Sequence, residues 1–340
     1  MPFLPVGKLR ADALQAIFDR HPVRDPRVIV GPRVGEDAAV IDLGDRCLVA
    51  TSDPITFATD ELGWYALQVN ANDIGVRGAR PRWFLATLLL PEGRTTGESV
   101  AALFEELTAA CDDLDVALVG GHTEITYGLD RPVVVGTMLG EVARDRLVTT
   151  GGAEVGDVVL LTKGIPIEGA ALIAREKEPE LLARGVAPSV VARAKGLLRT
   201  PGLSVLPEAA LACDVARVHA MHDPTEGGLA TALVELADAA DVGLRIERAC
   251  IAVLPEGAEL CRALGLDPLG TIASGALLMT VARVDAPVVI DALARDGIAC
   301  HAIGEVVPRG QGVTLVDGHG PAPMPVFPQD EVAKLFSNAS

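Results

Sequence analysis

The chain has 340 residues, about half of them hydrophobic, and a formal net charge of −17. This length allows two domains of ordinary size. The negative charge argues against a nucleic-acid or anionic-membrane partner, because phosphate binding at such surfaces needs clustered Lys and Arg.

The N-terminal stretch MPFLPVGKLR has no long apolar core, so we expect no secretory signal peptide. No run reaches the roughly 18 apolar residues of a membrane helix, and we therefore expect a cytoplasmic protein without a membrane partner. The six cysteines form no CxxC pair and lie mostly in apolar runs, which predicts reduced, buried thiols.

Strand and helix patterns alternate through the first half of the chain. A short helix is predicted at Leu9–Phe18, and the runs AAVIDL and CLVATSD around a turn at Gly44–Asp45 predict a hairpin. Apolar spacing predicts helices within 61–79 and 95–114, the second with a capping box of Thr95 and Glu98. Strands are predicted at RWFLATLLL and RPVVVGTMLGEV, and a short buried strand at VALVGG that ends at its glycines.

A change of composition at VTTGGAEVGD places a domain boundary near residue 150. We expect domains at 1–150 and 151–310, followed by a Pro- and Gly-rich peripheral tail at 311–340. Strands at DVVLLTKG, VGLRIE, SGALLMTV and HAIGEVV alternate with helices at EGAALIARE, Pro255–Leu264 and Ala286–Asp296. This alternation indicates an α/β or α+β class in both halves.

Four stretches place acidic or amide side chains among small residues near the ends of predicted elements. Each one alone is typical of a turn or a helix cap. Together they suggest a Mg²⁺ site completed by phosphates, because carboxylates packed closely repel one another unless a cation lies among them. The stretches are GEDAAV with Glu36 and Asp37, VATSDPIT with Asp53, VNANDIG with Asn70, Asn72 and Asp73, and HDPTEGG with Asp223 and Glu226.

In VALVGGHTE, the residues that could offer backbone N–H groups and a hydroxyl to a phosphate are Gly120, Gly121, His122 and Thr123. No Walker A motif is present, and no GxGxxG follows a strand. Lys163 either reaches a phosphate or is a surface lysine at a turn.

The start of the helix in HDPTEGGLATALVEL is either a plain cap made by Asp223 or Thr225 or an anion site. His219 and His222 lie three residues apart, and we expect them to have structural or supporting roles rather than to form a metal pair.

Five motifs in order, GEDAAVIDLG, VATSDPIT, VNANDIGVRGARP, VGGHTE and HDPTEGGLATAL, resemble the aminoimidazole ribonucleotide (AIR) synthase superfamily over about residues 30–307. The last motif is similar to that of HypE and its AIR-synthase-related relatives, with Glu226 where an Arg is expected. The resemblance implies a PurM-like α/β fold. Its N-terminal domain would form a β-barrel across a homodimer, and its C-terminal domain would be a second α/β unit.

The resemblance also implies ATP and Mg²⁺ as cofactors. By position, Asp37, Asp53, Asp73 and Asp223 match the carboxylates of the Mg²⁺–phosphate site. Asn72 and Gly120 to Thr123 match nucleotide contacts, and Lys163 matches a lysine that follows the first strand of the second half. Asp53, Asp223 and Lys163 are the expected catalytic residues.

The activity implied is ATP-dependent phosphorylation of an amide, carbonyl or hydroxyl oxygen on a small-molecule or protein-borne substrate, with release of ADP. The alternatives are a kinase similar to thiamine-monophosphate kinase, which leaves phosphate on its product, and a non-catalytic HypE-like maturation or partner protein. The sequence ends in EVAKLFSNAS and its last cysteine is Cys300, so the terminal cysteine that carries the carbamoyl group in HypE has no counterpart.

Overall fold

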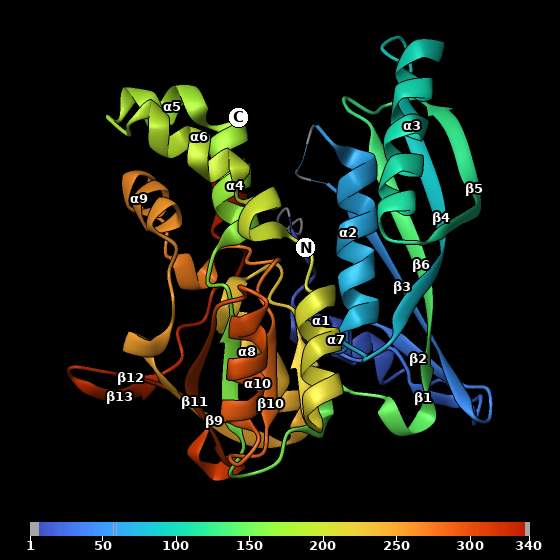
Figure 1. Cartoon of the computed structure of the whole chain (residues 1–340). Helices are drawn as coiled ribbons and strands as arrows, with labels where there is room; N and C mark the ends of the chain where they lie inside the picture. Colours follow the sequence, from blue (N-terminus) through green and yellow to red (C-terminus); the bar gives the residue numbers. More distant parts are fainter. Residues whose placement is uncertain (1–6, 57, 59, 337–340) are drawn as a thin grey trace. The chain divides into compact units, whose positions relative to one another are not determined.

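A computed structural model describes residues 7–56, 58 and 60–336 of the chain (Figure 1). The chain divides into two compact units. The six-stranded unit comprises Val23–Gly31 and Asp37–Leu147. The seven-stranded unit comprises the described parts of Met1–Pro22, Pro32–Glu36 and Val148–Ser340.

The six-stranded unit is one open, mixed sheet with two helices. Only β4 and β5 run parallel, and the other neighbouring strands of this sheet are antiparallel. The strands in spatial order are β1 (Val28–Val30), β2 (Ala39–Asp42), β3 (Arg46–Ile55), β6 (Val133–Ala143), β4 (Arg80–Pro91) and β5 (Ala117–Thr126). The helices are α2 (Leu62–Gly75) and α3 (Gly97–Asp113).

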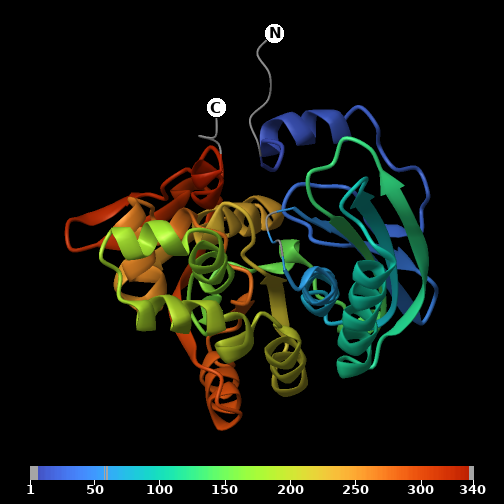
Figure 2. The same cartoon turned by 90° about the horizontal axis from the view of Figure 1, so that it is seen from above.

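Helix α2 packs against β3 and β6, while α3 packs beside α2 and against β5. Figure 2 shows the two helices side by side over the sheet. Helix α2 is buried almost all round, since its described side chains include only one, Val69, that is half-exposed. The strands alternate accordingly, and residues of β6 on the helix side, such as Val134 and Met138, are inaccessible to solvent.

The seven-stranded unit is a mixed sheet in which only β12 and β9 pair in parallel. Its strands in spatial order are β13 (Gly320–Pro323), β12 (Val313–Asp317), β9 (Val242–Glu247), β11 (Cys300–Pro308), β7 (Val158–Thr162), β10 (Leu278–Val281) and β8 (Val218–His222). Its helices are α1 (Ala11–Phe18), α4 (Ile167–Glu176), α5 (Glu178–Ala183), α6 (Pro188–Gly196), α7 (Leu206–Val215), α8 (Gly228–Ala240), α9 (Pro255–Leu264) and α10 (Ala286–Arg295).

Strand β7 is buried on both of its faces, as expected for a continuous apolar run in the centre of a sheet. Val159 and Leu161 pack with Leu233 and Leu236 of α8 in the main core cluster. The intervening Leu160 points to the opposite face, where α10 packs on β11 and on α7. Helices therefore cover both faces of this sheet.

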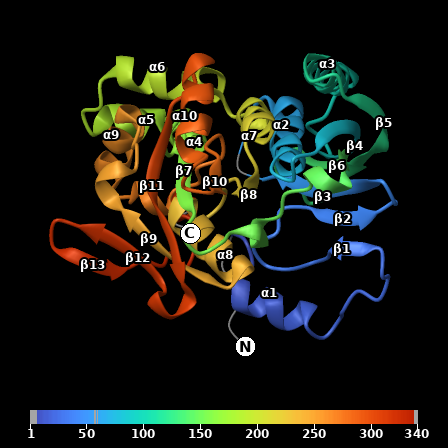
Figure 3. The same ribbon diagram turned by 60° about the horizontal axis from the view of Figure 1, so that its bottom comes forward.

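The last described segment is integrated into the seven-stranded unit. Strands β12 and β13 form a hairpin whose first strand pairs with β9, and Figure 3 shows this hairpin at the edge of the sheet. Beyond the hairpin, Asp330 to Ala333 are buried. A short helical turn, η5 (Pro268–Gly270), lies against this segment, and the ring of Phe327 contacts Gly270.

Most predicted elements are confirmed, including the hairpin of β2 and β3 and the helices α2, α3, α9 and α10. The predicted capping box is wrong by one residue, because Thr96 is the N-cap of α3 and exchanges hydrogen bonds with Ser99. Thr95 instead donates its hydroxyl to the carbonyl of Pro91. None of the six cysteines forms a disulfide, but Cys250 is exposed and Cys213 is half-buried.

Candidate functional site

Three of the predicted acidic residues belong to the six-stranded unit, with Asp37 just before β2, Asp53 in β3 and Asp73 in α2. The hydroxyl of Thr51 lies 2.6 Å from Asp73 Oδ2, to which it donates, and 3.1 Å from the carbonyl oxygen of Asp37. Arg77, whose side chain is fully buried, places Nη2 3.0 Å from Asp37 Oδ2. Thus Thr51 joins two predicted site residues that are 36 positions apart in sequence, and a buried guanidinium offsets part of their charge.

Asp53 lies inside β3 rather than after it, two residues beyond Thr51, so both side chains face α2. The backbone N–H of Asp53 donates to Asn70 Oδ1 at 3.0 Å, and Asn70 Nδ2 donates to the Asp53 carbonyl at 3.3 Å. Asn70 and Asn72 are fully buried on α2. We define Asp37, Asp53 and Asp73, with their supports Thr51, Asn70 and Arg77, as the α2–β3 acidic group.

The predicted phosphate loop has a different structure from the one expected. Its residues do not follow a buried strand but lie within β5, the exposed edge strand; they are Gly120, Gly121, His122 and Thr123. Strand β5 pairs with β4 as far as Thr126. Gly121 has φ +146°, and a Cβ at this position would overlap the Ala86 carbonyl on β4. Since two strands separate β5 from β3, these residues lie about 14 Å from Asp53 across the sheet.

In the seven-stranded unit, Asp223 directly follows β8 and is fully buried. The loop it opens ends in two glycines with left-handed backbones, Gly227 at φ +83° and Gly228 at φ +64°. A Cβ on Gly228 would lie 2.5 Å from the Leu269 carbonyl oxygen and 2.7 Å from that of Thr271, so the close approach of η5 requires glycine here. We name residues 223–228 the Asp223 loop.

The prediction that Asp223 or Thr225 caps the following helix is wrong. Gly227 is the N-cap of α8, and no side chain of the loop makes the capping hydrogen bond. The backbone N–H of Gly227 donates instead to Asp330 Oδ2 at 2.7 Å. Nothing in the sequence around Asp330 suggested this contact, because the two residues are 103 positions apart.

The two histidines both lie in β8 and are three residues apart, so their side chains point to opposite faces of the strand. His219 Nδ1 lies 2.9 Å from Asp157 Oδ2, and His222 Nε2 lies 3.0 Å from Glu235 Oε2 on α8. They therefore do not form a metal pair with each other. Glu235 of α8 therefore lies beside His222, the residue that directly precedes Asp223 in the chain.

Three carboxyl groups, from Glu168, Glu226 and Asp330, interact electrostatically around the starts of α4 and α8. Burial raises the pKa of Glu168 to about 7, and the charges of Asp330 and Glu226 act in the same direction against a hydrogen bond from Ser274. Burial also raises the pKa of Asp330 to about 7, against the N–H groups of Gly227 and Val332. The backbone N–H of Lys8 donates to Glu226 Oε2 at 3.0 Å.

Lys163 is not a surface lysine, since its side chain is only 6% exposed. Its Nζ lies 2.6 Å from Glu208 Oε1 and donates to the carbonyls of Ser204 at 2.7 Å and Gly202 at 3.1 Å. Burial lowers the pKa of the Lys163 ammonium, while the charge of Glu208 opposes this effect. The lysine thus already has three acceptors in the seven-stranded unit.

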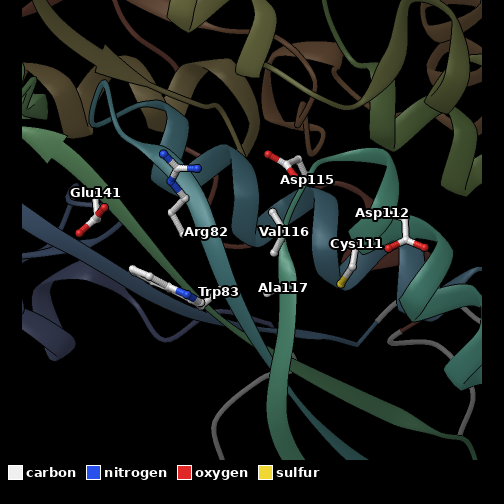
Figure 4. A pocket seen from close by; sticks show the side chains of 8 residues that line it. All are labelled: Arg82, Trp83, Cys111, Asp112, Asp115, Val116, Ala117 and Glu141. Atoms are coloured by element: carbon white, nitrogen blue, oxygen red, sulfur yellow. The ribbon is translucent and has the colours of Figure 1, made fainter.

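A cavity of about 500 Å³ lies elsewhere in the six-stranded unit. Figure 4 shows that its lining comes from β4, β5, β6 and the end of α3. The lining residues are Arg82, Trp83, Cys111, Asp112, Asp115, Val116, Ala117 and Glu141. None of the predicted site residues lines this cavity.

No helix in the described part of the chain has both the length and the apolarity to cross a bilayer.

Curated relatives resemble the chain over most of its length. A putative hydrogenase expression/formation protein, MJ0676 of Methanocaldococcus jannaschii, is 27% identical over 82% of this chain and 82% of its own. Carbamoyl dehydratase HypE of Cupriavidus necator is 29% identical over 82% of this chain and 79% of its own. Selenide, water dikinase of Geobacter sp. strain M21 is 29% identical over 89% and 92%, respectively.

Solved structures share the fold. Escherichia coli HypE, a hydrogenase maturation protein, superposes with a TM-score of 0.72 at 25% identity, over 90% of this chain and 94% of that chain. HypE in complex with ATP gives 0.70 at 22% identity over 97% and 98%. AaThiL complexed with AMPPCP and TMP gives 0.68 at 21% identity over 91% and 95%. The mixed α/β architecture is therefore PurM-like, the fold expected from the motifs.

Two family models match successive parts of the chain. The N-terminal domain of AIR synthase related protein matches residues 35–142, which include the α2–β3 acidic group. The C-terminal domain of AIR synthase related protein matches residues 154–317, which include the Asp223 loop. With both domains matched in order and relatives that are enzymes by name, the chain belongs to the AIR synthase-related family.

Proposed function

We propose that the chain is an ATP-dependent, Mg²⁺-requiring enzyme that phosphorylates an amide, carbonyl or hydroxyl oxygen of a small-molecule or protein-borne substrate. The observation that carries this proposal is the α2–β3 acidic group. Asp53 lies on β3, Asp73 on the buried helix α2 and Asp37 just before β2. Thr51 donates to the Asp73 carboxylate, Arg77 pairs with that of Asp37, and Asn70 holds the backbone of Asp53. A relative named selenide, water dikinase, and a HypE structure in complex with ATP, support the nucleotide.

The donor set fits Mg²⁺, because carboxylate oxygens are the protein ligands that this ion prefers when phosphates complete its shell. Asp37, Asp53 and Asp73 are the proposed ligands in the six-stranded unit, and Asp223 is a proposed ligand in the seven-stranded unit. When bound, Mg²⁺ supplies neutralisation of the charge on the transferring phosphoryl group. The buried Arg77 pairs with the Asp37 carboxylate and so limits repulsion within the group before any cation arrives.

The proposed reaction is an in-line displacement. The acceptor oxygen forms a bond to the γ-phosphorus, the bond from that phosphorus to the β,γ-bridging oxygen breaks, and ADP leaves with its electron pair. A hydroxyl or amide acceptor releases its proton to the solvent. Asn72, Gly120, Gly121, His122 and Thr123 are proposed nucleotide contacts. Lys163 is a proposed catalytic residue, and it would have to exchange Glu208 for a phosphate oxygen to act.

Calorimetry of Mg²⁺–ATP binding tests the proposal. Asp53→Asn and Asp223→Asn should each weaken binding by at least tenfold, whereas Asp45→Asn at the exposed hairpin turn should leave it unchanged. Failure of the wild-type chain to bind ATP with Mg²⁺ would contradict the proposal. Binding without turnover in the presence of candidate acceptors would support the non-catalytic HypE-like alternative.

Analysis of the product separates the two enzymatic alternatives. Phosphate retained on the product indicates a kinase similar to thiamine-monophosphate kinase, for which the likeness to AaThiL supports the fold alone. Free phosphate indicates that the phosphorylated oxygen leaves in a later step, as expected for a dehydratase or ligase type of reaction. Mass spectrometry of the product together with a phosphate assay distinguishes the two outcomes.

We also propose that the chain forms a homodimer through the sheet face of the six-stranded unit that α2 and α3 leave uncovered. This face carries half-buried apolar side chains, among them Leu85 and Leu89 on β4 and Val135 and Leu139 on β6. Leu139→Glu should convert a dimer to a monomer in light scattering, whereas Val155→Glu in an exposed loop should not. A monomeric wild-type chain would contradict this part.

A further inference from the structure

Asp330 makes the capping contact that the Asp223 loop lacks. Its Oδ2 accepts the backbone N–H of Gly227 at 2.7 Å, and its Oδ1 accepts that of Val332 at 2.8 Å. The residue is only 5% exposed. Both carboxylate oxygens therefore hold backbone groups, one in the loop before α8 and one in the segment that carries Asp330 itself.

The Asp223 loop depends on outside support because of its own sequence. Gly227 and Gly228 both adopt left-handed backbones. Because the N-cap residue is a glycine, it has no side chain that could accept the first N–H groups of α8. A negative carboxylate is the group best suited to the positive end of a helix. Asp330 thus holds the end of a short loop whose first residue is Asp223, the proposed Mg²⁺ ligand.

The segment that carries Asp330 has a second anchor, which is on η5. Glu331 Oε2 accepts the N–H of Asp267 at 3.1 Å, and the N–H of Glu331 donates to the Gly270 carbonyl at 3.0 Å. Val332 and Ala333 are buried beside them. The two adjacent acidic residues therefore make different contacts: Glu331 binds the segment to η5, and Asp330 contacts the Asp223 loop.

We infer that Asp330 is a positioning residue for Asp223, acting through the Gly227 backbone to fix where the loop presents the Asp223 carboxylate. Asp330 is not itself a catalytic residue, because its described contacts are to backbone N–H groups. This inference rests on the proposed function, in which Asp223 binds Mg²⁺–ATP. It extends that function to a residue beyond both matched family domains, which end at residue 317.

The experiment compares Asp330→Asn with Glu331→Gln in the full chain. The asparagine side chain keeps the size of the aspartate but has one acceptor oxygen for two N–H groups, so one of them loses its partner. Hydrogen exchange of the 223–231 backbone amides should become at least tenfold faster in Asp330→Asn. In Glu331→Gln it should stay within twofold of the wild type, even where the melting temperature falls.

Calorimetry gives the second readout. In Asp330→Asn, the dissociation constant for Mg²⁺–ATP should rise about tenfold, the lower end of the effect expected when the support of a metal ligand is lost. The dissociation constant for ATP without Mg²⁺ should change less than twofold in both variants. A merely structural role would weaken both forms of ATP equally and would affect Glu331→Gln as much as Asp330→Asn.

Two results would overturn the inference: unchanged hydrogen exchange of the loop in Asp330→Asn, or equal effects of the two variants on loop exchange and on Mg²⁺–ATP affinity. Absence of ATP binding to the wild type would instead count against the proposed function. In that case the exchange measurement alone still decides whether Asp330 fixes the loop.

Discussion

The α2–β3 acidic group and the Asp223 loop solve the problem of holding carboxylates in place by different means. The α2–β3 group takes its support from nearby secondary structure, with a hydroxyl from β3, an amide from α2 and the buried cation of Arg77. The Asp223 loop takes its support from Asp330, a residue 103 positions beyond Gly227, and lies among further carboxyl groups. Because its support is local and includes a positive charge, we expect the α2–β3 group to be fixed before ligands bind. Because its support is distant and lies among other carboxyl groups, we expect the Asp223 loop to be sensitive to pH and to the conformation of the segment that carries Asp330.

The largest expected effect concerns the counter-charge. Arg77→Met leaves Asp37 beside an apolar side chain, and loss of one partner of a buried ion pair costs about 3–5 kcal/mol. The melting temperature of the six-stranded unit should fall by on the order of 10 °C, measured by calorimetric scanning.

The matched control is Arg80→Met, which removes a largely exposed partner of Asp115. Exposed pairs contribute about 0–1 kcal/mol, so the melting temperature should hardly change. Equal effects of the two variants would show that the α2–β3 group does not depend on its buried cation, and the contrast drawn above would fail.

The next effect concerns the close packing of the Asp223 loop against η5. Gly228→Ala brings a Cβ within 2.5 Å of the Leu269 carbonyl oxygen and imposes a left-handed backbone on alanine. Overpacking and backbone strain together should cost about 2–4 kcal/mol. Thermal unfolding of the seven-stranded unit measures this loss.

Gly265→Ala provides the comparison, because Gly265 also has a left-handed backbone at φ +72° but no atom near its added Cβ. It should therefore cost only the strain, about 1–2 kcal/mol. If the two alanine variants melt at the same temperature, η5 yields readily, and the Asp223 loop is less constrained than its geometry indicates.

The pH dependence should also differ between the two regions. The pKa values of Glu168 and Asp330 are raised to about 7 from 4.5 and 3.8, so the folded seven-stranded unit binds more protons than the unfolded chain between these values. The contribution of these two groups to its stability is therefore greatest at low pH and is lost as pH rises from about 4 through 7. Melting temperatures at pH 5 and pH 8 measure this loss.

Glu168→Gln is the matched variant for this titration, because it removes one of the two carboxyl groups and nearly keeps the side-chain shape. The difference between the two pH values should shrink in this variant. If the difference in melting temperature between pH 5 and pH 8 is unchanged, other groups cause the pH dependence. The two regions would then not differ through the titration of Glu168.

The smallest effect concerns the hydroxyl that links the α2–β3 group. Thr51→Val keeps the shape of the side chain and removes its hydrogen bond to Asp73, which should cost about 1–2 kcal/mol. Ser52→Ala, on the other face of the same strand, removes hydroxyl contacts to Gly136 and Thr137 and is the control. Only Thr51→Val should also weaken Mg²⁺–ATP binding in calorimetry.

The sequence predicted most of the local structure, since the apolar periods of α2, α3 and β4 and the turn at Gly44–Asp45 are strong short-range signals. It predicted α8 but not its cap, because the partner of Gly227 comes from a distant segment of unremarkable composition. It misplaced the glycines of β5, which predict a loop by their flexibility. The structure uses Gly121 for close approach to β4 instead.

The α2–β3 group could be predicted only as separate acidic stretches. Nothing in GEDAAV indicates that Arg77 will pair with Asp37, because this contact depends on how α2 lies on the sheet. Likewise, nothing in the sequence around Lys163 predicts its ion pair with Glu208, a residue of α7 that lies 45 positions further along the chain. Contacts of this kind arise from tertiary packing, to which short-range patterns are blind.

The distance in sequence between Gly227 and Asp330 also bears on the order in which the protein becomes competent during synthesis. A ribosome adds roughly 5–20 residues per second, and N-terminal domains generally fold first. Every residue of the α2–β3 group is therefore translated well before the Asp223 loop. The loop itself must wait for 103 further residues, roughly 5–20 s, before its cap exists. A nascent chain stalled shortly after α10 would carry the six-stranded unit complete and the Asp223 loop without its support.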